Sequence, residues 1–337
     1  MIYVGIVGSG FGLYGLLPAF LSIDTCKVVS FCGKKTERLV TYCKRVHLKN
    51  VYTDWREMLR NEKLDVLAIA VPPLAQYEIA KVAIKQGINI FAEKPLAANY
   101  KQAKELLTLA NKGKIKHTVD FIFPEIESWQ KVKQLLVRNT FGKLEHISVE
   151  WDFLSYDIKN KISSWKMDVK QGGGALSFYF PHSLYYLEYF AGEISDVKSI
   201  FSYSQINNES RIETGVDMLL KFANGVNGIA HISCNSRGLN RHQLLFTCEK
   251  GVIILENKNN IVDNFRITIV REDGTKQFTM NKKTGRKKDV DERVEVVKKL
   301  ASRFVDSCIS KKDMKPSFAD GVRVQQLIER IRKNQIS

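Results

Sequence analysis

The chain has 337 residues, of which 44% are hydrophobic, and a formal net charge of +16. A chain of this length is too long to fold around one small hydrophobic core and is typical of a protein with two domains. The absence of low-complexity stretches, heptad runs and internal repeats excludes fibrous and repeat architectures. No apolar run approaches the roughly 20 residues that span a bilayer, and no secretory signal pattern is visible. We therefore expect a cytoplasmic protein without a membrane partner.

Charge and cysteine usage limit the partners. The basic residues are spread along the chain, and their densest cluster, residues 282–288, is typical of an exposed loop. A nucleic-acid partner is one interpretation of this charge and an anionic small ligand is the other; we expect no nucleic acid. The six cysteines contain no CxxC pair, so we expect reduced thiols and no metal site.

The first part of the chain alternates short apolar runs with helical patterns. Predicted strands cover residues 2–7, 27–31, 66–71, 88–92 and 116–121. Predicted helices cover residues 36–46, 55–61, 77–86 and 100–112. This alternation predicts βαβ units and a parallel sheet with right-handed crossovers. Residues 1–122 are therefore predicted to form a Rossmann domain of the α/β class.

The pattern changes near residues 121–124, where we place the domain boundary. A helix over 127–138 is followed by consecutive strand patterns at residues 144–152, 197–204, 216–223, 226–233, 243–247, 252–255, 265–270 and 276–279. Asn224-Gly225 between two of them indicates a two-residue hairpin. One helix over 175–190 interrupts the strands. Residues 123–337 are thus predicted as an α+β domain with an open, mostly antiparallel sheet, and the last helix, 319–333, is a candidate to pack back on the first domain.

A glycine-rich turn follows the first strand and contains Gly8, Ser9, Gly10, Phe11 and Gly12. Its first two glycines permit a tight turn and a close approach of the backbone to a pyrophosphate. The motif GxGxxG would place its third glycine at Leu13, so that role falls to Gly12 or Gly15. The position between a strand and a helix favours a dinucleotide site over a turn without a ligand.

The end of the second strand bears on the choice of cofactor. NAD-binding proteins usually carry a carboxylate there, whereas this chain has Gly33, Lys34 and Lys35. A small residue followed by two lysines leaves room for a 2′-phosphate and neutralises it. The pattern favours NADP over NAD, and a solvated loop is the alternative interpretation.

Further segments resemble one known family in the right order along the chain. They are Gly8 to Gly12 with Leu17-Pro18-Ala19-Phe20, Val71-Pro72-Pro73, Ala92-Glu93-Lys94-Pro95-Leu96, Trp165, Gly172-Gly173-Gly174-Ala175-Leu176, His182 and Phe318-Ala319-Asp320-Gly321. The sequence resembles the glucose-fructose oxidoreductase, inositol dehydrogenase and rhizopine-catabolism (Gfo/Idh/MocA) family of NAD(P)-dependent oxidoreductases. The resemblance spans nearly the whole chain.

This resemblance implies a hydride transfer between a sugar-type hydroxyl carbon and a nicotinamide. It implies Lys94 and His182 as catalytic residues that move the hydroxyl proton or bind the hydroxyl. A lysine can take that role where burial and a nearby cation lower its pKa; a strand-end lysine exposed to water is the alternative. The implied cofactor site comprises Gly8, Ser9, Gly10, Phe11, Gly12, Gly33, Lys34, Lys35, Val71, Pro72, Pro73, Gln76, Glu93 and Lys94.

The chain also departs from the family pattern. Phe178 and Tyr185 stand where many relatives have aspartates, and Gln76 replaces a frequent histidine. Either Lys94 and His182 suffice, with a tyrosine as proton donor, or the protein no longer catalyses. The candidate substrate residues are Trp165, Lys166, Phe178, Tyr179, His182 and Tyr185.

The leading hypothesis is an NAD(P)-dependent oxidoreductase that acts on a sugar, an inositol or a nucleotide-linked sugar. The alternative is a non-catalytic dinucleotide-binding sensor or regulator on the same fold. An open antiparallel sheet with an apolar outer face usually buries that face. We therefore expect a homodimer or homotetramer formed through the C-terminal sheet.

Overall fold

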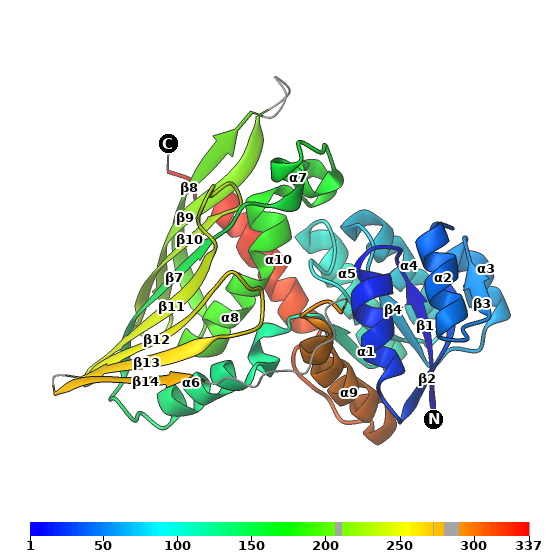
Figure 1. Ribbon diagram of the computed structural model, residues 1–337, viewed down its shortest axis with the longest axis horizontal. Coiled ribbons are helices and arrows are strands. Elements are labelled where there is room, and N and C mark those ends of the chain that lie inside the picture. Colours follow the sequence, from blue (N-terminus) through cyan, green and yellow to red (C-terminus); the bar gives the residue numbers. More distant parts are fainter. Residues whose placement is uncertain (206–210, 272, 280–289, 337) are drawn as a thin grey trace. The chain divides into compact units, whose positions relative to one another are not determined.

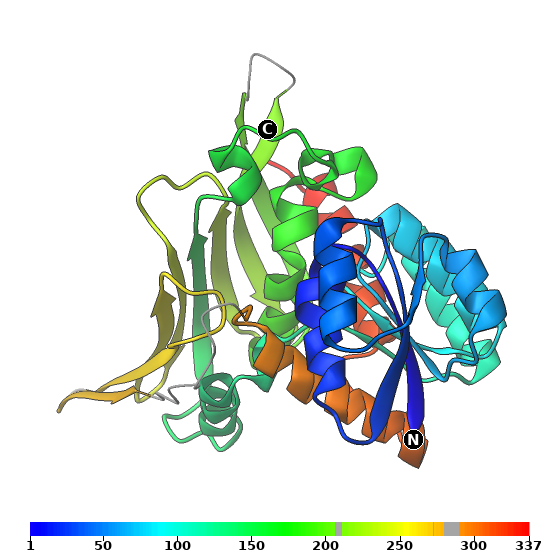
Figure 2. The same cartoon turned by 45° about the vertical axis from the view of Figure 1, so that its right-hand side comes forward.

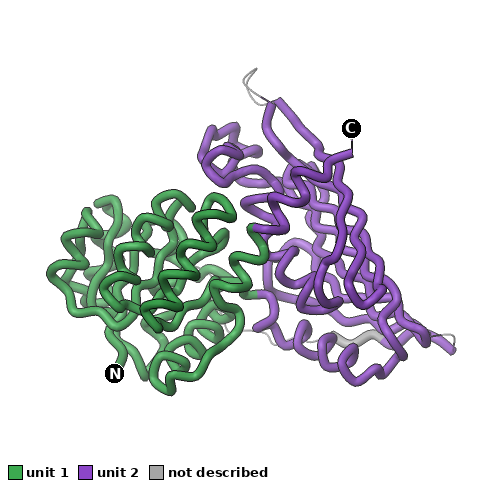
Figure 3. Tube along the Cα trace, turned by 180° about the vertical axis from the view of Figure 1, so that it is seen from behind, with its two compact units in different colours: residues 1–122, 287–325 green, residues 123–286, 326–337 purple. Residues whose placement is uncertain are grey.

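The computed structural model describes residues 1–205, 211–271, 273–279 and 290–336. The chain forms two compact units. Unit 1 contains Met1–Ile122 and Lys287–Gln325, and unit 2 contains Phe123–Arg286 and Gln326–Ser337 (Figure 3). The basic cluster at 282–288 lies outside the described residues. Over the described parts of both units, every helix is too short or too polar to span a lipid bilayer.

Unit 1 is built on a six-stranded parallel sheet with the strand order β3-β2-β1-β4-β5-β6 (Figure 1). The strands are β1 (Ile2–Val7), β2 (Cys26–Cys32), β3 (Asn50–Tyr52), β4 (Val66–Ile69), β5 (Asn89–Ala92) and β6 (His117–Val119). Every residue of β4 is buried, as expected for a strand covered on both faces. The predicted Rossmann sheet is confirmed, and β3 is an additional strand at its edge.

Helices follow most strands of unit 1. They are α1 (Leu17–Leu21), α2 (Glu37–Arg45), α3 (Trp55–Asn61), α4 (Pro73–Lys85), α5 (Tyr100–Gly113) and α9 (Val294–Ser310). A π-helical turn, η1 (Gly12–Leu16), precedes α1. Thr36 caps α2, because its hydroxyl accepts a hydrogen bond of 3.2 Å from the Leu39 amide. Gly87 follows α4 with a positive φ of 78°.

The second unit differs from the continuous region 123–337 that the sequence predicts. The segment around α9 belongs to unit 1, and the division falls within the last helix, α10 (Phe318–Lys333). The reason is the apolar face of α9, whose Leu300 and Phe304 are fully buried. The ring of Phe304 lies 5.9 Å from that of Phe91 on β5. This burial draws the segment back onto the parallel sheet.

Unit 2 is built on an eight-stranded sheet with the order β14-β13-β12-β11-β7-β10-β9-β8 (Figure 1; Figure 2 shows the same sheet turned by 45°). The strands are β7 (Leu144–Asp152), β8 (Ile194–Ser204), β9 (Ile212–Phe222), β10 (Asn227–Ser233), β11 (Arg241–Cys248), β12 (Gly251–Lys258), β13 (Arg266–Arg271) and β14 (Gly274–Thr279). The predicted, mostly antiparallel sheet is confirmed. Its one parallel pair joins β7 to β10. Gly225, with φ of 91°, forms the predicted turn between β9 and β10.

One face of this sheet carries the core of unit 2. The helices α6 (Glu127–Val137) and α8 (Pro181–Ala191) and short helical turns supply the packing residues. Trp129, Phe123 and Tyr186 are among the fully buried side chains. The predicted helix 175–190 is divided into a π-helical segment, η5 (Ala175–Tyr179), and α8, which begins at Pro181. The other face exposes apolar side chains of β8, β9 and β10.

Candidate active site

The glycine-rich turn of unit 1 depends on Gly8. Gly8 has a φ of +134°, which side chains rarely allow, and a Cβ at this position would lie 2.1 Å from the carbonyl oxygen of Ala70. Both observations require glycine here. The Gly8 amide also donates a hydrogen bond of 2.9 Å to the carbonyl of Cys32 at the end of β2. At Gly10, a Cβ would meet no atom within 4 Å. The turn is therefore fixed at its base and open at its tip, as a phosphate cradle must be.

The structure assigns the role of the third glycine to Gly12. A Cβ there would lie 3.3 Å from the carbonyl oxygen of Val7, so the absence of a side chain lets the helix approach the first strand closely. Gly15 instead makes room for the ring of Phe11. Arg293 lies over that ring with its guanidinium carbon 4.3 Å from the centroid.

Gln76 holds the turn that carries Lys94. The side chain of Gln76 is 1% exposed and its Nε2 is hydrogen-bonded to the carbonyls of Glu93 (2.6 Å), Pro95 (3.0 Å) and Leu96 (3.2 Å). The peptide bond between Lys94 and Pro95 is cis. In this structure Gln76 therefore shapes the backbone around Lys94, and Val71, Pro72 and Pro73 lie at the start of its helix, after β4.

Asp120 lies at the same edge of the sheet and is 1% exposed. Burial first, and the neighbouring Glu93 carboxylate second, raise the pKa of Asp120 well above its usual value. The positive charges of Arg293 and Lys94 oppose that rise. Two carboxyl groups and two cations thus interact at the carboxyl ends of β5 and β6, where open α/β sheets bind their ligands.

The end of β2 is tied to the glycine-rich turn by Ser9. The Ser9 hydroxyl accepts a hydrogen bond of 2.6 Å from the Lys34 amide, and a Cβ on Gly33 would lie 2.5 Å from it. The side chains of Lys34 and Lys35 are exposed. The carboxylate of Asp54, next along the chain after β3, is close enough to act electrostatically on Cys32.

Four candidate substrate residues of unit 2 lie together. The ring of Phe178 contacts Trp165 and Tyr179 edge to face, at centroid distances of 5.2 Å and 4.6 Å. The ammonium of Lys166 lies 5.6 Å from the centroid of Phe178 and 3.7 Å from the carboxylate of Asp157. Burial raises the pKa of Tyr179, which keeps its hydroxyl protonated.

A buried ion pair positions the glycine triplet beside this aromatic cluster. The side chain of Glu213 on β9 is fully buried and lies 2.6 Å from the guanidinium of Arg332 on α10. Its Oε1 accepts a hydrogen bond of 2.7 Å from the Leu176 amide, at the start of η5. Gly174 has a φ of +88°, and a Cβ there would lie 2.8 Å from the same carboxylate oxygen. Glu213 therefore fixes the segment that carries Phe178 and Tyr179.

His182 and Tyr185 lie on α8, and both are half-buried. The ring of His182 contacts Phe123 edge to face at 5.1 Å. The next tyrosine, Tyr186, belongs to the core: its hydroxyl contacts Nε2 of His242 at 2.8 Å, and burial lowers the pKa of His242 to about 3. Tyr186 and its partner His242 therefore have a structural role in the core, whereas His182 and Tyr185 remain the site candidates on α8.

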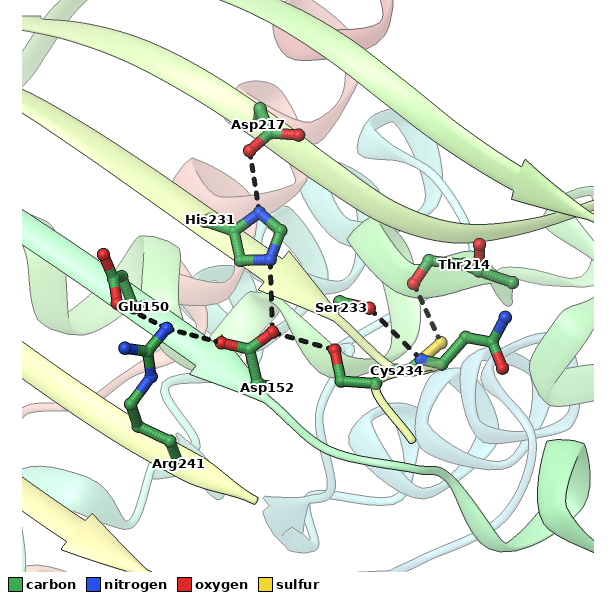
Figure 4. A network of polar contacts seen from close by, with 10 residues as sticks. Glu150, Asp152, Thr214, Asp217, His231, Ser233, Cys234 and Arg241 are labelled. Atoms are coloured by element: carbon green, nitrogen blue, oxygen red, sulfur yellow. Dashed lines mark hydrogen bonds and ion pairs between the residues drawn. The ribbon is translucent and has the colours of Figure 1, made fainter. Parts of the chain in front are cut away.

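A second polar cluster lies on unit 2 outside the aromatic cluster (Figure 4). His231 on β10 is placed between Asp217, at 2.7 Å from Nδ1, and Asp152, at 3.3 Å from Nε2. Arg241 contacts Asp152 at 3.0 Å and Glu150 at 2.6 Å. These groups alternate with the buried residues of their strands and so share the open face of the sheet.

The sequence-predicted residues therefore form separate groups in the two units. In unit 1, the glycine-rich turn, the loop at Gly33 and the turn at Lys94 all follow the carboxyl ends of parallel strands. Sequence reasoning missed Asp120, Arg293 and Glu213. Asp120 lies within the predicted strand 116–121 and follows the observed strand β6, which ends at Val119, so the position of that strand end was the missing signal. Arg293 and Glu213 carry no motif. No cluster of three or more potential metal ligands occurs among the described residues.

Comparison with known proteins agrees with this geometry. Residues 2–121 match the description "Oxidoreductase family, NAD-binding Rossmann fold", and residues 129–254 match "GFO/IDH/MocA C-terminal domain". An uncharacterised oxidoreductase of Synechocystis sp. is 27% identical over 97% of this chain and 92% of its own length. Levoglucosan dehydrogenase of Pseudarthrobacter phenanthrenivorans is 25% identical over 71% of this chain and 69% of its own. A solved levoglucosan dehydrogenase with NADH and L-sorbose has the same fold, with a TM-score of 0.86 at 20% identity, and the match covers 99% of this chain and 96% of that one.

Proposed function

Because the chain belongs to the Gfo/Idh/MocA family of NAD-binding oxidoreductases, we propose that it transfers a hydride between a nicotinamide and a hydroxyl or keto carbon of a sugar, an inositol or a nucleotide-linked sugar. The observation that carries the proposal lies within unit 1. An open phosphate-binding turn at Gly10 and an ammonium group at Lys94 both follow the carboxyl ends of strands of one parallel sheet. Ligands of such sheets bind along that edge.

The residues of unit 1 fit a dinucleotide. The backbone of Gly8 to Gly12 would hold the pyrophosphate, because the turn has no side chain over Gly10. Val71, Pro72 and Glu93 would line the nicotinamide half. When bound, the nicotinamide accepts or donates the hydride. The protein itself orients both reactants and moves the proton of the hydroxyl group.

Lys94 and His182 are proposed to bind the reacting hydroxyl and move its proton. Two features of the chain support Lys94: the position at the sheet edge and the contacts by which Gln76 fixes the surrounding backbone. The substrate candidates Trp165, Lys166, Phe178 and Tyr179 would present an aromatic surface suited to the apolar face of a sugar. Tyr179 and Tyr185 would donate hydrogen bonds to the substrate in place of the aspartates that the family resemblance implies at positions 178 and 185.

The first test compares the wild type with Lys94→Ala against a panel of sugars, inositols and nucleotide sugars, by cofactor absorbance. We expect turnover to fall by about 100-fold or more, because a positioned acid–base group contributes that much. Cofactor binding, measured by fluorescence titration, should persist. Lys166→Ala tests the substrate side separately and should raise KM more than it lowers kcat.

A non-catalytic sensor on the same fold predicts a different outcome. It would bind the dinucleotide tightly and give no turnover with any compound of the panel, with or without Lys94. Phe178, at a position where the family resemblance implies an aspartate, is the feature that favours this second candidate. If the wild type turns over a compound of the panel, turnover that is unaffected by Lys94→Ala would contradict the catalytic role of Lys94.

We also propose NADP as the preferred cofactor. Lys34 and Lys35 are exposed at the end of β2, and the Ser9 hydroxyl positions the Lys34 backbone beside the phosphate turn. The double variant Lys34→Ala with Lys35→Ala should weaken binding of NADPH more than binding of NADH. Equal losses would mean that the pair does not recognise the 2′-phosphate, and would favour Asp54 as a partner for the ribose hydroxyls of NAD.

The open face of the unit 2 sheet is proposed to form a homodimer or homotetramer. Ile200, Leu219 and Ile229 are 52%, 59% and 43% exposed on neighbouring strands. Together they form an apolar surface that a monomer would leave in water. The charged network around His231 borders this surface and would give an interface between two copies its polar rim.

A further inference from the structure

Two carboxyl groups meet at the carboxyl edge of the parallel sheet in unit 1. β5 and β6 are neighbours in which Ala92 pairs with Val119, so the next residues, Glu93 and Asp120, leave the sheet side by side. The Asp120 amide donates a hydrogen bond of 2.8 Å to the Ala92 carbonyl. The Glu93 carboxyl is close enough to raise the pKa of Asp120, by its charge and by a side-chain hydrogen bond, in addition to the larger effect of burial. Two neighbouring carboxylates repel each other when both are ionised, so this arrangement favours a proton on the buried Asp120.

The surroundings of the pair favour the same protonation state. Asp120 is 1% exposed, and its buried Oδ1 has no hydrogen-bond partner within the part of the chain that the structure describes. An ionised oxygen in that position would be costly, whereas the carbonyl oxygen of a neutral acid costs less. The cations that act on Asp120 are Lys94 and Arg293, and Arg293 is engaged by Asp291 through two hydrogen bonds of 2.9 Å and 2.8 Å. Burial and the unpartnered oxygen therefore favour the protonated form of Asp120 beside the Glu93 carboxyl.

We propose that Glu93 and Asp120 form a proton switch set by the charge of the cofactor. They share one proton beside a neutral nicotinamide ring and release it to solvent beside a cationic one. The only bond that breaks is the O–H bond of the shared proton, which passes to the buffer and leaves two carboxylates. The inference rests on the proposed function, because it requires a nicotinamide cofactor.

The position of the pair in the sheet supports this assignment. A sheet with the order β3-β2-β1-β4-β5-β6 consists of two mononucleotide-binding halves, and the glycine-rich turn belongs to the half formed by β1 to β3. The pair follows two strands of the other half, which is the half left for the nicotinamide nucleotide. A positive charge near two carboxyl groups favours their second ionisation. Oxidised cofactor would thus bind with proton release, and reduced cofactor would bind without it.

The experiment counts the protons linked to cofactor binding. The full chain is titrated with oxidised and with reduced cofactor by calorimetry near neutral pH, in two buffers that differ in ionisation enthalpy. We expect the oxidised form to release up to about one proton more than the reduced form. Asp120→Asn should abolish the difference while both cofactors still bind. Glu93→Gln should do the same, which keeps the test valid if one variant fails to fold.

Two further variants identify the source of the proton. Glu105→Gln removes a carboxylate of unit 1 on α5 that is paired with Lys81 on α4. This variant should retain the full difference in proton release between the oxidised and the reduced cofactor. Lys94→Met should also retain it. The proposal is overturned if the wild type shows no difference, or if Lys94→Met abolishes it and Asp120→Asn does not. Absence of binding for both cofactors would instead remove the proposed function and the inference with it.

Discussion

Asp120 shows how one buried group makes stability depend on pH. Its pKa is raised above the unfolded value, first by burial. The folded state therefore binds the proton more tightly, and the contribution of Asp120 to stability is full below the unfolded pKa and is lost as pH rises through the folded pKa. We predict that Asp120→Asn gains stability relative to the wild type as pH increases from about 5 to about 8. Urea unfolding midpoints across that range measure the change.

Glu105 supplies a control with the opposite sign. The hydrogen bond from Lys81 first, and that from Tyr77 second, lower its pKa. Its contribution to stability is present above the unfolded pKa and is lost as pH falls through the folded pKa. The stability of Glu105→Gln relative to the wild type should therefore not increase as the pH rises. A common trend for both variants would contradict the explanation by buried protonation.

The residues of unit 1 differ in how well the sequence predicts them. Gly8 is found because a glycine-rich turn directly follows a predicted strand. Lys94 is found because it ends another strand in a Glu-Lys-Pro segment that resembles the family's pattern. The sequence places Gln76 at the cofactor site, and the structure adds its hydrogen bonds to the backbone around Lys94. Arg293 could not be predicted, because its contact with Phe11 joins segments distant in sequence.

Single long-range contacts also position whole elements. The carboxylate of Glu213 on β9 links α10 to the π-helical segment η5, through Arg332 and the Leu176 amide. Arg332→Leu would leave a fully buried carboxylate without its charge partner. We predict a loss of about 3 kcal/mol in the free energy of unfolding, because removal of one partner of a buried pair leaves the other charge uncompensated. Denaturant unfolding at neutral pH measures this loss.

A matched variant distinguishes the contribution of the ion pair to stability from the contribution of side-chain packing. Arg330 on the same helix forms a more exposed pair with Asp196, at 3.5 Å, so Arg330→Leu should cost less than Arg332→Leu. Equal losses would indicate that both arginines act mainly through their aliphatic stems.

Local patterns predict elements better than their connections. Apart from β3, the strands of both sheets follow from apolar patterns, and the Asn224-Gly225 turn follows from its backbone requirement. The π-helical start at Ala175 was not predicted, since it depends on Glu213 and Gly174 packing against it. The parallel pairing of β7 with β10 also escaped prediction, because both neighbours of β7 in the sheet are distant in sequence.

At the scale of the whole molecule, the grouping of segments depends on burial rather than on chain order. The helix α9 joins unit 1 after the chain has completed the strands of unit 2, because Phe304 and Leu300 are buried in the core of the first unit. A contiguous boundary near residue 122 follows from the change in sequence pattern, but the return of residues 287–325 does not. Amphipathic periodicity identifies the apolar face of a helix and leaves its partner unspecified.

The open sheet face provides the last prediction. A hollow of about 330 Å³ is lined by Ile200, Leu219, Ile229 and Ile336 together with polar residues of the same strands. In a two-fold dimer this patch would be buried against the same patch of the second copy. A charged substitution in the chain would therefore place two charges in the interface. We predict that Ile200→Asp combined with Leu219→Asp lowers the mass in solution to that of one chain, as measured by light scattering.

Because both side chains are more than half exposed, the double variant should keep the fold and the cofactor affinity of the monomer. Ile309 on α9 of unit 1 is 51% exposed and isolated from this surface, so Ile309→Asp should leave the mass unchanged. A wild-type chain that stays monomeric at all concentrations, or a double variant with the wild-type mass, would contradict assembly through this face. A change in mass with Ile309→Asp would instead assign the interface to unit 1.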